Sequence, residues 1–294
     1  MNREPEHGSG SHHSDLQQKG LHGDSSQAGG TMTEKNGHHP EQGLKDSHSS
    51  HAGHEGHGQL AGEKKTAGVQ VEWVSNPETV ETNKETDIFL EIKDAAGQAI
   101  EGFSVVHEKE MHLLAIKKDL SVFLHLHPEY LGKGRFQIKT IFPKAGRYKL
   151  YADFLPEGAN QQLASHELVV TGAESNEEID ADKVLKKRVD DIEIELILPE
   201  AKVNEHLKLI FALSNGNGSP ITELEPYLGS AGHVVIVSED MEEFLHVHPA
   251  DENTKGPKVE YMTSFPRKGL YKIWGQFKYK GKLYTAPFVI EVQE

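Results

Sequence analysis

Cysteine is absent from this 294-residue chain, and its absence removes several kinds of chemistry at once. Without thiols the chain can form no disulfide, no thiolate zinc site, no iron–sulfur cluster and no cysteine nucleophile. Basic residues are also scarce relative to acidic ones, since 31 Lys and Arg stand against 46 Asp and Glu, which gives a formal charge of −15. This balance offers no basic patch for phosphate contacts and argues against a nucleic-acid partner.

Long apolar runs are missing as well. No segment is long enough to span a bilayer as a helix, and the start, MNREPEH, lacks the apolar stretch of a signal peptide. We therefore expect either a soluble cytoplasmic protein or the mature part of an exported one. Phosphate-binding loops rich in glycine, the Gly-x-Ser-x-Gly motif and paired carboxylates are also absent, so no common catalytic signature is found.

Residues 1–66 are rich in Gly, Ser, Gln, Glu and His and contain ten of the nineteen histidines. Such a segment buries too little apolar surface to offset the entropy of ordering, so it is predicted to be disordered. Four of its histidines follow one another at intervals of three residues: His48, His51, His54 and His57. Their small neighbours would let several imidazoles gather around one ion as a loose site. The alternative is a solvated tail or an expression tag.

The rest of the chain consists of short runs in which apolar and polar residues alternate, which is typical of β-strands. Examples are TDIFLEIKD, SVFLHLHP and SHELVVTG in residues 67–172, and DIEIELILP, HVVIVSED and KLYTAPFVIEV in residues 189–294. Each series predicts a β-sandwich. Residues 173–188 are acidic and then basic, and are predicted to form a charged linker. The expected fold is all-β, with two tandem immunoglobulin-like sandwiches after a disordered tail.

One histidine pattern occurs twice, at an offset of 121 residues. His112, His125, His127 and Pro128 recur as His233, His246, His248 and Pro249. Further on, FPKAGRYKLYADF matches FPRKGLYKIWGQF at an offset of 123 residues. The chain therefore contains a duplicated domain.

The repeated histidines have the spacing of a metal site on a hairpin. Side chains alternate along a strand, so His125 and His127 share one face. If Lys117 pairs with Val122, His112 lies directly opposite His127, about 5 Å away between Cβ atoms, and diagonal to His125 at ~7 Å. The same spacing holds in the second copy. Three neutral imidazoles suit zinc or copper, so one three-histidine site is expected in each copy.

Other interpretations stay open. A His-x-His-Pro strand can be a structural corner, and duplication alone explains why it appears twice. An open three-histidine zinc site can also activate water, with Glu108 or Glu110 handling the proton, in which case the protein would be a hydrolase or hydratase. His166 and His206 have no counterpart in the other copy, and a surface or local structural role is expected for each.

The stretch VVHEKEMHLLAIKKDLSVFLHLHPEYLGKGRFQIKTIFPKAGRYKLYADF resembles bacterial exported β-sandwich proteins related to the YtkA-like domains, which have an immunoglobulin-like fold. The stretch LEPYLGSAGHVVIVSEDMEEFLHVHP resembles their companion half. The resemblance covers roughly residues 100–172 and 185–294. It implies copper or heavy-metal handling at the cell envelope, with an envelope metal transporter or chaperone as partner, and it adds His107 and Met111 to the candidate ligands.

Together these observations predict a metal-binding protein rather than an enzyme. The tail would collect ions loosely, and the folded sites would hold or relay them, with copper ahead of zinc. The alternative is an envelope interaction module in which only the tail binds metal.

Overall fold

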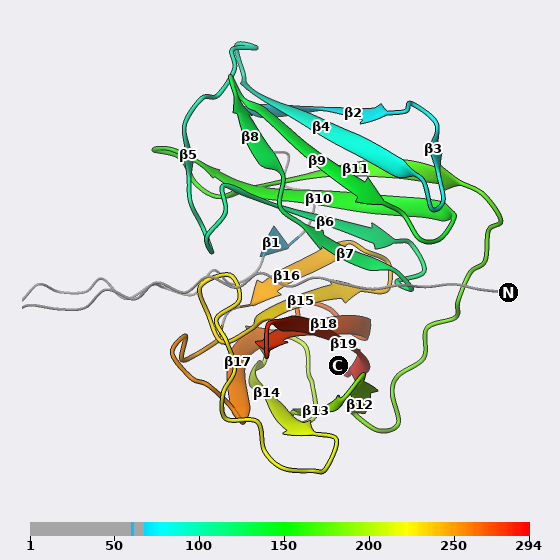
Figure 1. Ribbon diagram of the computed structural model, residues 1–294, viewed down its shortest axis with the longest axis vertical. Helices are drawn as coiled ribbons and strands as arrows, with labels where there is room; N and C mark the ends of the chain where they lie inside the picture. The colour runs from blue at the N-terminus through cyan, green and yellow to red at the C-terminus, as the bar shows by residue number, and fades with distance from the viewer. Residues whose placement is uncertain (1–59, 62–67, 248) are drawn as a thin grey trace, which may run out of the picture. The chain divides into compact units, whose positions relative to one another are not determined.

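The computed structural model describes residues 60–61, 68–247 and 249–294, with only the backbone of Leu60, Ala61 and His246. All the regular secondary structure in these ranges is β-strand (Figure 1), so the all-β prediction is confirmed. The described residues include no helix long and apolar enough to cross a membrane. The disorder predicted for the tail, and the tail histidines His48, His51, His54 and His57, lie outside the described residues.

The first copy is a sandwich of two sheets, drawn one above the other in cyan and green in Figure 1. One sheet has the strand order β2 (Val69–Asn76), β4 (Glu85–Asp94), β9 (Arg135–Ile141) and β8 (Glu129–Gly132). The other has the order β3 (Val80–Glu81), β11 (Gln162–Thr171), β10 (Gly146–Pro156), β6 (Met111–Lys117) and β7 (Phe123–Leu126), and β5 (Phe103–Ser104) also pairs with β10.

The second copy repeats this plan. One sheet has the order β12 (Lys186–Val189), β13 (Ile192–Ile197), β14 (His206–Asn215) and β17 (Lys258–Ser264). The other has β16 (Glu243–Val247), β15 (His233–Ser238), β18 (Gly269–Tyr279) and β19 (Lys282–Val292), with β1 (Leu60–Ala61) at its edge on β16. In both copies the chain distributes its strands between the sheets as in immunoglobulin domains, which confirms the predicted tandem sandwiches.

Each sandwich has its own core because its strands alternate as the sequence indicates. In β4, Ile88, Leu90 and Ile92 point inward and are almost fully buried. In β14, Leu207, Leu209, Phe211 and Leu213 do the same. The two sets belong to separate apolar clusters, one in each copy.

β6 and β15 break this alternation. All seven residues of β6 and all six of β15 are buried, so both faces of each strand are covered. Their outer faces belong to a third apolar cluster, which we call the interface cluster. Its buried members are Leu114, Ile116, Leu120 and Tyr151 from the first copy, and Val235, Val237, Met241, Phe244 and Trp274 from the second.

The interface cluster is built from equivalent residues of the two copies. Tyr151 stacks on Phe244 with ring centroids 4.9 Å apart, and Phe123 stacks on Trp274 at 4.7 Å. Phe123 corresponds to Phe244, and Tyr151 to Trp274, in the duplicated sequence. Each contact is thus repeated with the roles of the copies exchanged, which is the pattern of an isologous, two-fold interface.

A buried ion pair anchors the segment that leaves the first copy. Lys117 is 1% exposed and donates from Nζ to Asp119 Oδ2 at 2.5 Å, to Ser175 O at 2.8 Å and to Asn176 Oδ1 at 3.2 Å. Burial alone would raise the pKa of Asp119, but hydrogen bonds from Lys117 and Ser121 outweigh it and hold that pKa at about 2. The carboxylate therefore stays charged beside the buried ammonium.

Replacing the carboxylate by an amide, Asp119→Asn, leaves the Lys117 charge buried without its counter-ion. We expect the free energy of unfolding to fall by about 2–4 kcal/mol, because hydrogen bonds to charged groups and buried ion pairs are costly to break on one side only. Chemical denaturation followed by circular dichroism measures this change.

The matched control is Glu167→Gln, which breaks the exposed pair between Lys118 and Glu167. Exposed pairs contribute little, so this variant should leave the free energy of unfolding almost unchanged. Equal effects of the two substitutions would contradict a special role for the buried pair.

Candidate metal centre

The β6–β7 hairpin brings three histidines of the first copy together. Its register pairs Leu113 with Leu126 and Ile116 with Phe123, and the Lys117 amide bonds to Val122 O, as predicted. The side chains of Leu124 and Leu126 pack against the core of the first copy. On the other face, one ring nitrogen from each of three histidines lies within 4.8 Å of the other two: His112, His125 and His127.

Two acceptors outside this triad fix where the imidazole protons lie. The Nε2 of His112 is 3.0 Å from the carbonyl oxygen of Val106, and the Nδ1 of His125 is 2.7 Å from Oε1 of Gln276. Gln276 is oriented in turn by its Nε2, which donates to Thr285 Oγ1 at 3.2 Å. Because carbonyl and amide oxygens only accept hydrogen bonds, these two ring nitrogens carry the protons. Such outer partners are typical of metal-bound histidines.

The remaining nitrogens of these two rings face each other. His112 Nδ1 and His125 Nε2 are 3.2 Å apart, and in neutral imidazoles with the protons so placed both are acceptors. Two lone pairs at this distance repel unless a cation or a shared proton lies between them. The buried Nε2 of His127, nearby, has no hydrogen-bond partner among the described residues. The group could therefore hold a metal ion.

His233 of the second copy lies beside the triad of the first copy. Its side chain is 1% exposed, and its ring centroid lies 4.9 Å from that of His125 and 5.9 Å from that of His112. The sequence predicts one three-histidine site per copy, and the site of the second copy stays a prediction because two of its ligands are not described. The isologous contact brings the equivalent positions of β6 and β15 to the same place. The backbone of His246 lies in β16, but its side chain and the whole of His248 are outside the described residues.

His107 lies at the edge of this group, on a tight turn between Val106 and Lys109. Its ring centroid is 6.2 Å from that of His112 and 6.1 Å from that of His233. Both His107 and Glu108 have positive φ, at 49° and 65°, which is uncommon for residues other than glycine. The second copy has the same turn, with Leu228 and Gly229 in place of these two residues. We refer to His107, His112, His125, His127 and His233 together as the histidine cluster.

Met111 does not point toward the histidine cluster. It is fully buried in the core of the first copy, on the face of β6 opposite His112. Its counterpart is Gly232, where a Cβ atom would come within 2.6 Å of the Phe277 ring and 2.8 Å of the Tyr261 hydroxyl. The second copy therefore has no room for a methionine here, and the candidate centre has no thioether from this position.

Sequence reasoning missed two polar residues beside the histidine cluster. Asp153 pairs with His112 across β10 and β6, and Gln276 pairs with His233 across β18 and β15. Both side chains are buried, and they occupy equivalent positions in YKLYADF and YKIWGQF. The sequence does contain a signal for them, because a polar residue stands at the same position of two otherwise apolar strands in the two copies.

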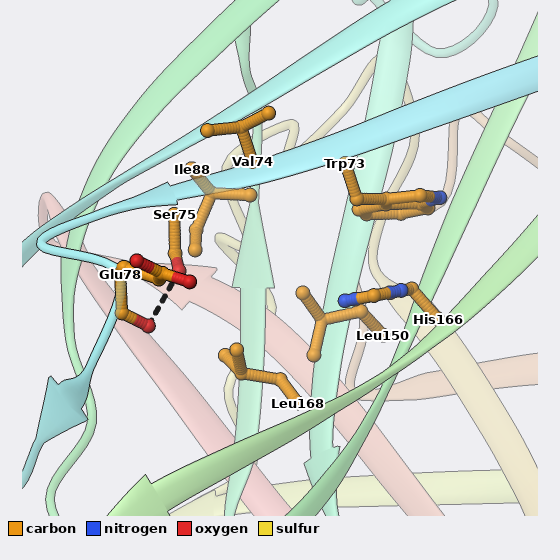
Figure 2. A pocket seen from close by; sticks show the side chains of 8 residues that line it. All are labelled: Trp73, Val74, Ser75, Glu78, Ile88, Leu150, His166 and Leu168. Atoms are coloured by element: carbon orange, nitrogen blue, oxygen red, sulfur yellow. Dashed lines mark hydrogen bonds between the residues drawn. The ribbon is translucent and has the colours of Figure 1, made fainter.

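A separate pocket of about 380 Å³ opens in the first copy (Figure 2). Trp73 and His166 stack on one side of it with ring centroids 5.2 Å apart, and Val74, Ile88 and Leu168 also line it. His166 thus packs against an aromatic ring, and burial lowers its pKa. His206, the other histidine without a counterpart, is exposed at the start of β14.

Comparisons with solved structures give distant matches. The chain is 17% identical to FdeC, an Escherichia coli adhesin, over 77% of this chain and 64% of that one, with a TM-score of 0.26. It is 9% identical to the Yersinia pseudotuberculosis adhesin InvE, over 76% and 60%, with a TM-score of 0.25. The fibronectin(III)-like modules of Clostridium thermocellum CbhA match with 16% identity over 76% and 93%, and a TM-score of 0.22. The chain spans less than two thirds of either adhesin, and TM-scores this low say nothing of function.

No curated protein matches the chain. A family described as a domain of unknown function, DUF8832, matches residues 64–172 and again residues 187–294. The two matched segments are the two copies seen in the sequence repeat and in the sandwiches. The chain therefore belongs to the DUF8832 family and carries its domain twice.

Proposed function

We propose that this protein binds a transition-metal ion through His112, His125 and His127. The observation that carries the proposal is the 3.2 Å approach of two ring nitrogens whose protons are held elsewhere by Val106 O and Gln276 Oε1. A cation between these nitrogens relieves their repulsion and uses both lone pairs. Three imidazoles with one further position are a familiar donor set for zinc and copper.

Copper is placed ahead of zinc. Among divalent first-row metal ions, Cu(II) binds nitrogen ligands most tightly, as the Irving–Williams order states. The chain has no cysteine, and Met111, the methionine next to a ligand, is buried in the core, so neither gives the triad a sulfur ligand that would favour Cu(I). The donor set therefore suits Cu(II) best and Zn(II) next.

The proposed role is to capture, hold or relay the ion rather than to catalyse a reaction. Glu108, a candidate proton carrier for zinc-dependent hydrolysis, is exposed and its side chain lies beside Gly229. The outer partners of His112 and His125, a backbone carbonyl and an amide, are neutral and hold the rings in place. The histidine-rich tail supplies further donors for loose capture, and the resemblance to exported bacterial proteins suggests the cell envelope, with a metal transporter or chaperone as partner.

Burial also favours, at two of the imidazoles, the neutral form that metals require. It lowers the pKa of His127 to about 4, with a smaller effect from His112 and Lys109. Burial likewise lowers the pKa of His112, against the opposing effect of the Val106 hydrogen bond and of Asp153. Protons therefore bind the unfolded chain more readily than the folded one between about pH 6.5 and pH 4 at His127.

The metal-free protein should lose stability as pH falls through this window. The contribution of neutral His127 is complete above about pH 6.5 and decreases toward pH 4, because the unfolded state takes up the proton first. Denaturation at a series of pH values should show a shallower pH dependence for His127→Asn than for the unaltered protein.

His206→Asn is the control, since His206 is exposed on the other sheet of the second copy. This variant should keep the unaltered pH dependence. If His127→Asn also keeps it, the imidazole is not held neutral by the fold.

Metal titration tests the proposed function directly. The full chain with all ten tail histidines changed to Asn should still bind one Cu(II) or Zn(II) tightly, measured by calorimetry at pH 7.5. Adding His125→Ala and His127→Ala removes two of the three ligands, so the tight site should disappear, with affinity reduced at least about 100-fold.

The matched control combines His166→Ala and His206→Ala, which removes two folded histidines outside the cluster and should leave tight binding unchanged. Binding that vanishes with the tail histidines alone would contradict the proposal and favour an interaction module. Ester hydrolysis or CO₂ hydration by the zinc-loaded protein, lost in His125→Ala, would favour an enzyme.

A further inference from the structure

We infer that the ion held by the first-copy triad takes its fourth ligand, His233, from the second copy. The inference rests on the proposed function and specifies how the site is completed. A single ion bound by four imidazoles would then connect the two sandwiches.

The ring separations carry the first step. Two imidazoles on one tetrahedral ion, with metal–nitrogen bonds of about 2.0–2.1 Å, have ring centroids roughly 5 Å apart. Within the triad the centroids are separated by 5.4 Å for His112 and His125, 5.1 Å for His112 and His127, and 4.8 Å for His125 and His127. His233 lies 4.9 Å from His125 and 5.9 Å from His112 on the same measure, so it borders the triad and adjoins His125 at the spacing of two ligands on one ion.

The surroundings of His233 carry the second step. His112 and His233 are the most buried histidines among those whose exposure the structure gives, at 2% and 1%. His112 and His233 also lie nearly parallel, at 12°, with ring centroids 5.9 Å apart, so the two equivalent side chains approach the same space from opposite sheets.

The second copy also orients a ligand of the first, which is the third step. Gln276 pairs with His233 across β18 and β15, and its Oε1 accepts the hydrogen bond from Nδ1 of His125. In this cross-strand pair, Gln276 accepts the hydrogen bond from His125, and the ring of His233 lies next to the ring of His125. Gln276 acts as a positioning residue, because it fixes which nitrogen of His125 faces the ion.

The alternative is two separate ions, one for each hairpin, as the duplicated sequence alone suggests. The two arrangements differ in stoichiometry and in ligand count. One shared ion requires four imidazoles around a single metal. Two separate ions require about three imidazoles each, completed by water or another group, with both metals bound tightly.

X-ray absorption spectroscopy of the zinc-loaded protein distinguishes these arrangements without altering the cluster. The sample is the full chain with the ten tail histidines changed to Asn, loaded with one equivalent of Zn(II). The expected result is four imidazole nitrogens around each zinc and a second equivalent that binds at least about tenfold more weakly. Three imidazoles per zinc, or two equally tight ions, would overturn the inference.

Three variants then test the two second-copy residues. His233→Ala should reduce the ligand count from four imidazoles to three and weaken zinc binding at least about tenfold. Gln276→Leu should keep four imidazoles but weaken binding and make it more sensitive to pH, because His125 is no longer held in one tautomer. Gln276→Glu restores an acceptor and should recover tight binding.

His206→Ala is the matched control in the second copy and should change neither measurement. Far-ultraviolet circular dichroism and the unfolding midpoint of each metal-free variant show whether it is folded. If the triad is needed for binding but His233→Ala, while folded, leaves the ligand count and the affinity unchanged, this inference fails and the proposed function stands. If removing the triad itself leaves binding intact, the proposed function fails.

Discussion

The packing of β6 against β15 is the interaction on which the candidate metal centre depends. Their outer faces supply Leu114 and Ile116 from one copy, and Val235 and Val237 from the other, and burying these side chains removes apolar surface from water. His112 and His233 lie at the beginning of the same two strands. Because the apolar residues fix how the sheets meet, they also fix which imidazoles meet, and the polar site is positioned by contacts that contain no metal ligand.

Much of the fold follows from the sequence because a strand has a side-chain period of two. The alternation in TDIFLEIKD assigns Ile88, Leu90 and Ile92 to a core, and the structure confirms this. The register of the β6–β7 hairpin is predictable for the same reason, since a turn after Lys117 leaves few ways to keep Leu124 and Leu126 inside. The proximity of His112, His125 and His127 is thus a local consequence of one hairpin.

The joining of the two copies could not be predicted in the same way. The continuous apolar runs MHLLAI and HVVIV indicate strands buried on both faces, but an apolar run does not specify what covers it. The hydrogen bond between His125 and Gln276 joins residues 151 positions apart, and no local pattern encodes such a contact. The sequence therefore predicts the ligands of one hairpin, whereas their neighbours from the other copy depend on tertiary packing.

The isologous interface has a consequence for how such a site can change over time. In a symmetric dimer of identical chains, any substitution near the axis appears on both sides at once. In this single chain the two sides are independent, and they already differ: Asp153 corresponds to Gln276, and His107 corresponds to Leu228. Fusing the two halves into one polypeptide thus lets a two-fold site carry an acidic residue on one side and a neutral amide on the other, an asymmetry that a symmetric homodimer of the same domain cannot have.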